Sequence, residues 1–334
     1  MIYRKSHPAE LQYKVLVDTL AQMKSLGLQR VRLSGGGEPT FHRSFQKIIE
    51  HLYKHDIVLS NLTTNGLLCD NTMLDLLCSG KWFGIVFSLQ VLNEKDWMKI
   101  TGGPRRGFQK VMKNIRYLVE KKLAAKSSWP YVCLSLGINE FTYRNLTGGY
   151  EFAQELGVDV LSFKTYNTYK YSKKVLSASN YILKQLKDIK DDNEMNKRSM
   201  SIAYSLKDLK LNEMFSQEYD VQGDESAFYC SDHYNTQCFM PWFGTLIRAS
   251  GDVSVCCALP PESPVLGNIY DASFKTIWFG KKYTEIRNKF ERVLNSKTIN
   301  TKYLPINIRC TKYARPDEGC SLRVSLERMS KYYM

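Results

Sequence analysis

The residues best suited to chemistry in this 334-residue sequence are its nine cysteines, which are unevenly distributed. An odd number of cysteines is not typical of a disulfide framework. Cys69, Cys78 and Cys133 each lie within an apolar segment, so we interpret them as small buried hydrophobic residues. The other six gather towards the C-terminus, at Cys230, Cys238, Cys256, Cys257, Cys310 and Cys320. This second group has the residue type needed to ligate a metal.

Two of these cysteines frame a predicted β-hairpin in the segment CFMPWFGTLIRASGDVSVCC, residues 238–257. The turn Ser250-Gly251-Asp252 has a glycine at the bend, which is typical of a hairpin. Cys238 and Cys256 lie at opposite ends of the two arms, so folding the hairpin brings them together. The alternative is two unrelated buried cysteines, but the doubling of Cys256 by Cys257 favours metal ligands.

A glycine-rich turn, RVRLSGGGEPTFH at residues 30–42, is the second candidate for ligand binding. Glycine lets a ligand approach the backbone without meeting a Cβ, and Pro39 fixes the shape of the turn. Glu38 places one carboxylate beside this bare backbone. The turn lacks the two glycine-rich signatures that mark phosphate loops. Its simpler interpretation is a tight connection between a strand and a helix.

Strand and helix patterns alternate along the first half of the chain, which indicates a parallel sheet with helical crossovers. The predicted strands are residues 30–34, 56–62, 83–89, 131–137 and 158–163. The predicted helices are residues 9–26, 45–55, 71–80, 108–123 and 145–157.

Small and polar residues follow four of these strands. They are Gly35 to Glu38, Thr63 to Gly66, Ser88 with Gln90, and Asn139 with Glu140. Parallel strands end at one edge of a sheet, so we expect these groups to meet at one rim and form a ligand site.

Composition excludes several classes of protein. The chain carries 47 basic and 33 acidic residues, a net charge of +14, but no long basic run. We therefore favour a solvated basic surface over a nucleic-acid groove. The sequence has no apolar run long enough to span a membrane and no apolar core of an export signal after Met1. A cytoplasmic location is expected.

The glycine-rich turn and the strand ends resemble the radical S-adenosylmethionine (SAM) enzymes. The resemblance rests on Gly36-Gly37-Glu38-Pro39, on Thr64-Asn65-Gly66 and on Ser88. It implies that Gly36, Gly37, Glu38, Pro39, Thr64, Asn65 and Ser88 bind SAM, with Glu38 facing its ammonium group. Family members bind the SAM carboxylate with an arginine, for which Lys99 can substitute here. Asn139, at the next strand end, completes the predicted cofactor contacts.

The C-terminal region resembles the SPASM or twitch domain, an auxiliary iron–sulfur module. Cys238, Gly251-x4-Cys256, Gly267-Asn268-Ile269 and Ile277-Trp278 match its pattern, and one helix is expected to carry Ile277, Trp278 and Ile286. Tyr313 stands where the pattern has a further cysteine. The resemblance implies one 4Fe-4S cluster, held by Cys238, Cys256, Cys310 and Cys320. Zinc is the alternative metal, and Cys257 or Cys230 could replace one ligand.

Radical SAM chemistry also needs a C-x3-C-x2-C loop for its catalytic cluster, and no cysteine of this chain precedes Cys69. Truncation just past that loop is favoured over natural loss. The printed chain is therefore not expected to cleave SAM.

The expected architecture is α/β. A partial (β/α)6 TIM-like barrel without its first strand spans residues 1–225, and a smaller α+β iron–sulfur domain spans residues 226–334. The resemblance implies, for the full form, reductive cleavage of SAM and abstraction of hydrogen from a peptide or small-molecule substrate, with an external electron donor. The alternative is a non-catalytic iron–sulfur or zinc protein that binds peptides or acts as a scaffold.

Overall fold

The computed structural model describes residues 10–35, 37–164, 173–196, 200–205, 240–255 and 265–295. These residues belong to two compact units. The first unit contains residues 30–205, and the second combines residues 10–29 with residues 240–295. Each unit has its own sheet, so the two are described separately.

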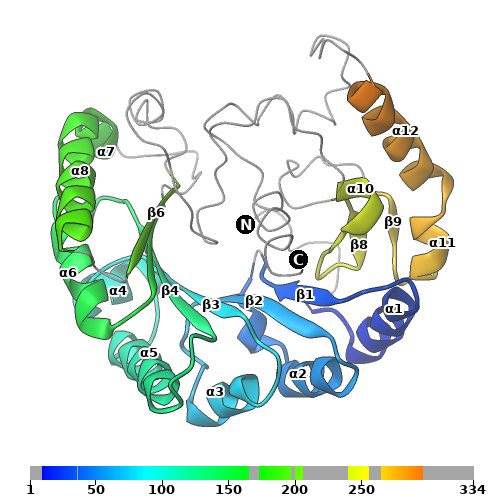
Figure 1. Cartoon of the computed structure of the whole chain (residues 1–334), viewed down its shortest axis with the longest axis horizontal. Helices are drawn as coiled ribbons and strands as arrows, with labels where there is room; N and C mark the ends of the chain where they lie inside the picture. Colours follow the sequence, from blue (N-terminus) through cyan, green and yellow to red (C-terminus); the bar gives the residue numbers. More distant parts are fainter. Residues whose placement is uncertain are drawn as a thin grey trace. The chain divides into compact units, whose positions relative to one another are not determined.

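The first unit is built on a parallel sheet of six strands in the order β1-β2-β3-β4-β5-β6. Figure 1 shows the strands following one another in an arc, with helices on its outer side. The strands are β1 (Arg30–Leu33), β2 (Val58–Thr64), β3 (Gly84–Leu89), β4 (Tyr131–Gly137), β5 (Val160–Lys164) and β6 (Ser201–Ser205). This confirms the predicted α/β class and the five predicted strands, and it adds β6.

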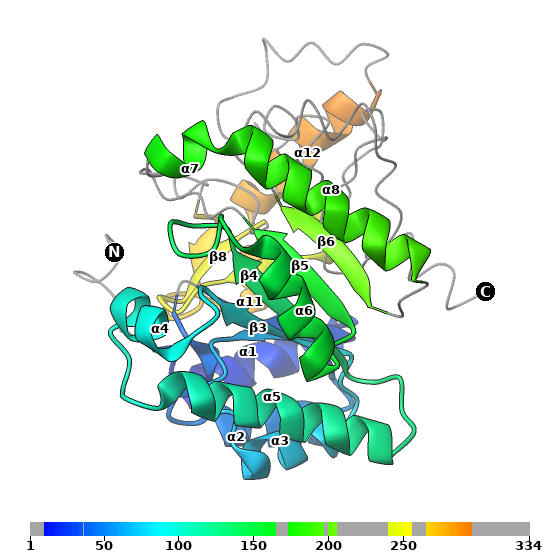
Figure 2. The ribbon, with the colours of Figure 1, turned by 90° about the vertical axis from the view of Figure 1, so that its left-hand side faces the viewer.

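Helices connect successive strands of this unit (Figures 1 and 2). They are the 3-10 helix η1 (Pro39–Phe41), α2 (Phe45–Lys54), α3 (Asn71–Cys78), α4 (Glu94–Thr101), α5 (Gly107–Ala124), α6 (Leu146–Leu156), α7 (Lys173–Ser177) and α8 (Ser179–Met195). Local signals set several helix ends. Asn93 and Asn145 accept the first free backbone amides of α4 and α6, and Gly102 and Gly157 end them with positive φ.

The sequence patterns missed α4, α7, α8 and β6. The segment of α8 does carry a helical stripe, since Ile182, Leu186 and Ile189 are buried at that spacing. β6 (SIAYS) has serine or alanine at three of its five positions. This composition gives a weak strand pattern, and pairing with β5 decides its structure.

The two faces of the sheet differ in what covers them. Side chains of a strand alternate between the faces, so residues two apart share one. Leu136 faces α6, because a Cβ on Gly149 of that helix would overlap it. Val86, Cys133 and Val160 pair across β3, β4 and β5 on the opposite face and form a small buried cluster. We call this opposite side the concave face.

The second unit contains α1 (Tyr13–Ser25), α10 (Met240–Phe243), α11 (Phe274–Trp278), α12 (Lys281–Asn295) and a three-stranded antiparallel sheet. The strands are β7 (Leu246–Ile247), β8 (Asp252–Ser254) and β9 (Gly267–Asn268). The predicted hairpin is confirmed, because β7 and β8 pair across a turn in which Gly251 has a φ of 85°. The helix expected over Ile277 to Ile286 is instead two helices. They separate at Gly280, where a Cβ would overlap the carbonyl of Thr276.

Helix α1 packs within this second unit, although the predicted boundary placed it in the barrel domain. The amide of Gln12 donates to the hydroxyl of Tyr270 at 2.9 Å, and Gln22 Oε1 accepts from the amide of Lys275 at 3.2 Å. Val15 and Met23 pack against the buried cluster of the unit. No helix in the described part of the chain is long and apolar enough to span a membrane.

Gly84→Ala is expected to destabilise the first unit by about 1–3 kcal/mol. A Cβ at Gly84 would overlap the ring of Tyr131, whose hydroxyl accepts a hydrogen bond from Asn61. Gly35→Ala is the control, because its Cβ would meet no atom closer than 3.8 Å. Urea unfolding measures both variants. Equal stability losses would contradict this packing of Tyr131 over Gly84.

Candidate functional site at the carboxyl ends of the strands

The carboxylate of Glu38 joins the ends of β1 and β2. Glu38 follows β1, is half-buried and caps η1. Its Oε1 accepts from the amide of Thr40 at 3.1 Å, from the hydroxyl of Thr40 at 2.7 Å and from the hydroxyl of Thr64 at 2.6 Å. Its Oε2 accepts from the amide of Asn65 at 2.5 Å. The predicted residues Glu38, Thr64 and Asn65 are therefore in direct contact.

These bonds leave Glu38 with some capacity for a ligand. A carboxylate offers roughly four acceptor positions, and Oε2 uses one of its two. Gly37 is exposed, and a Cβ there would meet no atom within 4 Å. Bare backbone beside an acceptor that is not saturated suits an ammonium group. The geometry fits the amino-acid end of SAM, although most of the carboxylate's capacity is spent on the protein's own donors.

The turn after β2 is fixed by close packing and by two hydrogen bonds at Gly66. Gly66 adopts a φ of 77°, and a Cβ there would collide with Phe87 and Val111. The buried Asn114 of α5 donates to the carbonyl of Gly66 at 2.8 Å. The hydroxyl of Thr64 accepts from the amide of Gly66 at 3.0 Å while it donates to Glu38. Position 66 requires glycine for two reasons: its positive φ is unfavourable for other residues, and Phe87 and Val111 leave no space for a Cβ.

Asn139 makes an equivalent link between the ends of β3 and β4. Its Nδ2 donates to the carbonyl of Gln90 at 2.6 Å, and its Oδ1 accepts from the amide of Phe141 at 2.8 Å. Ser88 lies one residue before the end of β3, opposite Ser135 of β4. Both residues thus lie at the predicted rim. The side-chain amide of Asn139 is used in hydrogen bonds that hold the rim together.

For two other predicted SAM contacts, Pro39 and Lys99, the structure gives fewer interactions at the rim. Pro39 begins η1 beside Glu38. Lys99 lies on α4 with an exposed side chain, 3.8 Å from the carboxylate of Asp96. Its ammonium also lies 5.9 Å from the centre of the Phe141 ring. Its role at a SAM carboxylate remains a prediction. Gly36 lies outside the described residues.

The predicted metal ligands Cys238, Cys256, Cys310 and Cys320 also lie outside the described residues, as do Cys230 and Cys257. Within the described part of the chain, no three His, Cys, Asp or Glu side chains are grouped as metal ligands would be. The donor set itself, four thiolates, fits an iron–sulfur cluster or zinc.

Cys69, Cys78 and Cys133 were predicted to be buried, and two of the three are. Cys69 and Cys133 are fully buried, as predicted, whereas Cys78 at the end of α3 is only partly buried. The difference arises because Cys78 occupies the last turn of a short helix. Burial raises the pKa of Cys69 to about 12, which leaves its thiol protonated and unreactive.

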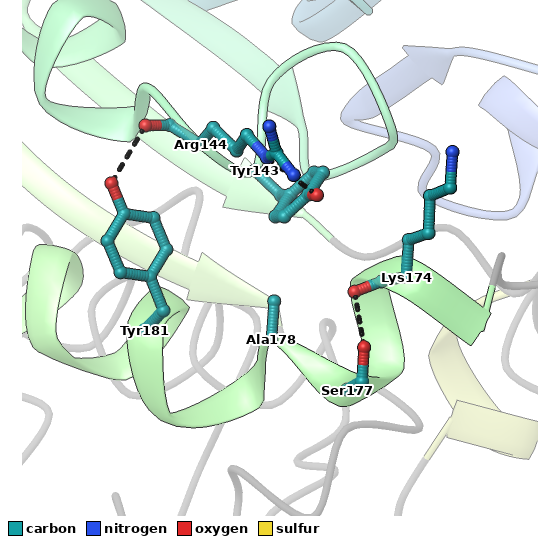
Figure 3. Close-up of a pocket in the computed structure, with 6 residues that line it drawn as sticks. All are labelled: Tyr143, Arg144, Lys174, Ser177, Ala178 and Tyr181. Atoms are coloured by element: carbon teal, nitrogen blue, oxygen red, sulfur yellow. Dashed lines mark hydrogen bonds between the residues drawn. The ribbon is translucent and has the colours of Figure 1, made fainter.

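A surface pocket of about 510 Å³ was missed by sequence reasoning. Figure 3 shows Tyr143 and Arg144, from the loop after β4, facing residues of α7 and the start of α8. Arg144 donates to the hydroxyl of Tyr143 at 2.8 Å, and Tyr181 donates to the carbonyl of Arg144 at 3.2 Å. The pocket combines segments about 30 residues apart, so no local motif marks it. It is lined by Tyr143, Arg144, Lys174, Ser177, Ala178 and Tyr181.

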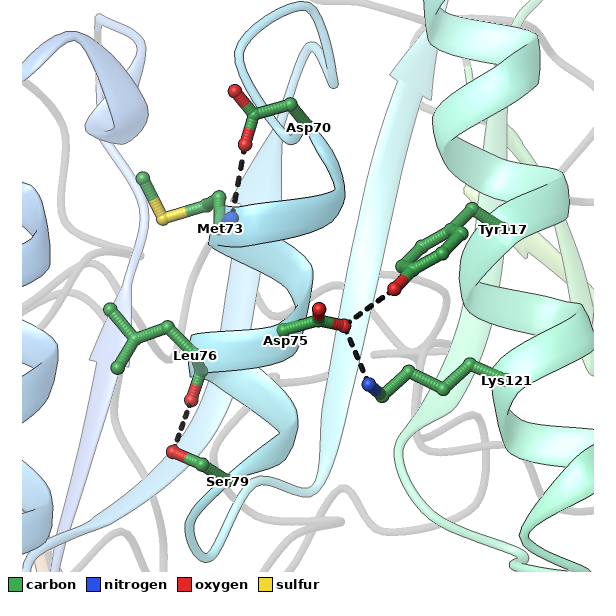
Figure 4. Close-up of polar contacts among 7 residues, drawn as sticks. All are labelled: Asp70, Met73, Asp75, Leu76, Ser79, Tyr117 and Lys121. Atoms are coloured by element: carbon green, nitrogen blue, oxygen red, sulfur yellow. Dashed lines mark hydrogen bonds and ion pairs between the residues drawn. The ribbon is translucent and has the colours of Figure 1, made fainter.

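A further polar cluster lies on the helical side and is structural (Figure 4). Asp75 of α3 accepts from the hydroxyl of Tyr117 at 2.7 Å and from the ammonium of Lys121 at 2.5 Å, both on α5. These hydrogen bonds lower the pKa of Asp75 and connect the two helices. Asp70 caps the same α3 by accepting from the amide of Met73 at 3.0 Å.

Comparison with known proteins assigns the two parts of the chain. Residues 2–142 match the radical SAM superfamily, and residues 238–302 match SPASM, an iron–sulfur cluster-binding domain. The chain belongs to the radical SAM/SPASM family. The first match covers the rim from the glycine-rich turn through Asn139. The second begins at Cys238 and includes Cys256, whereas Cys310 and Cys320 lie beyond its end.

Curated relatives carry the name of one related enzyme. A probable GTP 3',8-cyclase of Methanococcus vannielii is 34% identical over 90 residues, 26% of this chain and 30% of the relative. The GTP 3',8-cyclase of Synechocystis is 26% identical over 143 residues, 43% of this chain and 41% of the relative. The matched segments thus span less than half of these relatives.

Solved structures of similar fold cover nearly the whole chain. SuiB of Streptococcus suis bound to the precursor peptide SuiA gives a TM-score of 0.58 at 18% identity, covering 97% of this chain and 71% of that one. The enzyme anSMEcpe with bound AdoMet and the Cp18Cys peptide gives 0.61 at 20% identity, covering 96% and 83%. At these identities the likeness shows the fold alone.

Glu38→Gln is expected to lower stability by about 1–3 kcal/mol. The amide nitrogen of glutamine would face donors that the carboxylate now satisfies. Thr40→Val removes one neutral donor to the same carboxylate and should cost about 0.5–1.5 kcal/mol. Chemical denaturation of both variants measures this difference. A Glu38→Gln protein as stable as the wild type would contradict the role of Glu38 in holding the rim.

Proposed function

We propose that this protein binds SAM at the rim formed by Glu38, Thr64, Asn65, Ser88 and Asn139. We propose further that, in its full form, it belongs to the enzymes that cleave SAM reductively to abstract hydrogen from a substrate. The observation that carries the proposal is the coincidence of two results. Glu38, Thr64 and Asn65, three of the residues predicted as SAM contacts, lie together at strand ends, and anSMEcpe, a protein of similar fold, has AdoMet bound.

The protein's own part in this function is positioning. When bound, SAM supplies a reactive deoxyadenosyl group, whose generation needs an iron–sulfur cluster and an external electron donor. Gly37 offers open backbone, and Glu38 offers a charged acceptor for the ammonium. Glu38 and Asn139 hold adjacent strand ends in place before any ligand arrives. A preorganised site of this kind loses less free energy on binding.

The substrate class is proposed more broadly, as a peptide or a small molecule. Peptide substrates are supported by SuiB and anSMEcpe, whose structures contain peptides. A small-molecule substrate is supported by the relatives named GTP 3',8-cyclase. We also propose one auxiliary 4Fe-4S cluster on Cys238, Cys256, Cys310 and Cys320, with zinc as the alternative, and a cytoplasmic location.

A second candidate function is a non-catalytic SAM-binding or peptide-binding protein. It is supported by the SPASM match, an iron–sulfur cluster-binding domain, and by the peptide in the SuiB structure. Chromatographic assay of 5′-deoxyadenosine under strong reductant tests this second function. The 334-residue chain is expected to release none, and release would contradict the non-catalytic alternative.

The purified protein is expected to hold about four irons when prepared without oxygen, because four thiolates suit one cluster. Cys238→Ala or Cys256→Ala should remove most of this iron. Cys78→Ala is the matched control, since Cys78 is a partly buried thiol on α3 and should leave the iron content unchanged. Iron and zinc analysis measures the result. Stoichiometric zinc without iron would overturn the cluster.

SAM is expected to bind the printed chain weakly, with a dissociation constant of about 0.1–1 mM. Glu38→Gln should weaken this binding by about 1–2 kcal/mol, because it removes the charge facing the ammonium. Thr40→Val keeps that charge and should bind SAM nearly as well as the wild type. Isothermal calorimetry, at a temperature at which all three proteins are folded, measures these affinities for SAM. Equal affinities of the wild type and Glu38→Gln for SAM would mean that the turn containing Glu38 has only a structural role.

A further inference from the structure

Three serines form a row across the concave face. Ser88 of β3 pairs with Ser135 of β4, and Ser135 pairs with Ser162 of β5. Their side chains share one face because paired residues in a parallel sheet point the same way. Ser135 and Ser162 are each only 1% exposed, and neither hydroxyl has a hydrogen-bond partner in the structure as described.

Unpaired buried hydroxyls are unusual and costly. Most buried polar side-chain atoms in proteins have a partner, and an unsatisfied one loses its hydration without compensation. Two such hydroxyls at neighbouring positions of one row point to a partner group that the described residues do not supply. Each hydroxyl can donate one hydrogen bond as well as accept, so one group with several acceptor atoms would satisfy both.

Lys164 supplies a positive charge beside this row. It lies two residues after Ser162 on β5, on the same face, and pairs with Gly137, which has no side chain. Burial lowers the pKa of Lys164. No carboxylate among the described residues offsets this effect through an ion pair or a nearby charge.

Two neighbours act on the charge of Lys164. After burial, which lowers the pKa of Lys164 most, Cys133 raises this pKa and Arg32 lowers it further. Cys133 lies on β4 two residues before Ser135, on the concave face. Arg32 lies on β1 opposite Asn61 and is exposed.

We infer that Lys164, Ser135 and Ser162 form a binding site for an oxyanion on the concave face, with Arg32 adding positive charge. The group bound is a carboxylate or a phosphate of the ligand. The inference rests on the proposed function in one respect, that the ligand occupies this face of the sheet. It deepens that function, because it assigns the ligand an anionic group next to the rim.

The two possible sources of the anion are SAM, which carries a carboxylate, and a substrate, which would carry a phosphate or carboxylate. The chemistry at the site is the same for both. Charge-assisted hydrogen bonds from an ammonium and neutral ones from hydroxyls stabilise either group. Two probes, SAM and inorganic phosphate, separate the sources.

The test is thermal unfolding of the full chain at constant ionic strength, titrated with inorganic phosphate or with SAM. At least one probe should raise the unfolding temperature of the wild type. Lys164→Met should weaken that probe's binding about tenfold or more, because it removes the charge and keeps the length. Without a probe, Lys164→Met should unfold at the same or a higher temperature than the wild type. Lys184→Met, an exposed lysine of α8, is the control for general attraction to a basic protein.

Ser162→Ala provides a second test if Lys164→Met does not fold. It removes an unpaired hydroxyl, so stability should be retained while affinity for the same probe falls severalfold. Dependence on Lys164 for phosphate identifies a substrate anion, and dependence for SAM identifies the SAM carboxylate. Absence of binding by both probes, or equal binding to the wild type and Lys164→Met, would overturn the site. Iron content and deoxyadenosine release are separate measurements, so the proposed function can fail independently.

Discussion

The parallel register of six strands is the constraint on which the first unit depends. It brings every strand end to one rim and gives each strand the same two faces. One face packs against helices through residues such as Leu136, which lies against Gly149 of α6. The other carries the cluster of Val86, Cys133 and Val160, and above it the serine row. A shift by one residue in any strand would exchange these faces and destroy both the core and the site.

The rim is held by side-chain hydrogen bonds between neighbouring strand ends. Glu38 joins the turns after β1 and β2, and Asn139 joins the ends of β3 and β4. These residues therefore shape the candidate site as well as line it. A charged group that accepts four protein donors is a rigid support, because losing it leaves several buried donors unpaired. Ser135 and Ser162 are different, since their hydroxyls have no hydrogen-bond partner in the part of the chain that the structure describes. Rigid supports around unsatisfied groups are typical of a site that sacrifices stability for binding.

The second unit brings together segments that are far apart in the sequence. Helix α1 packs against residues more than 250 positions later, through the contact of Gln12 with Tyr270. This unit is complete only after its C-terminal elements have been made, whereas the first unit uses a continuous segment. Contacts of such long sequence separation are formed late in folding because closing the intervening loop costs entropy. The second unit thus combines a helix of the radical SAM match with elements of the SPASM match.

The sequence by itself determined the α/β class, five strands with their helices, the hairpin around Gly251 and the meeting of Glu38 with Thr64 and Asn65. These followed from local periodicity, glycine positions and the rule that parallel strands end together. Tertiary structure decided what local patterns do not contain. Pairing with β5 made a strand of Ser201–Ser205, Gly280 divided one expected helix into two, and α1 packed in the second unit. The placement of Lys164 beside Ser135 and Ser162 also depended on strand register. The alternation within one strand fixes only which residues share a face, and which residues of neighbouring strands pair is decided when segments far apart in the chain come together.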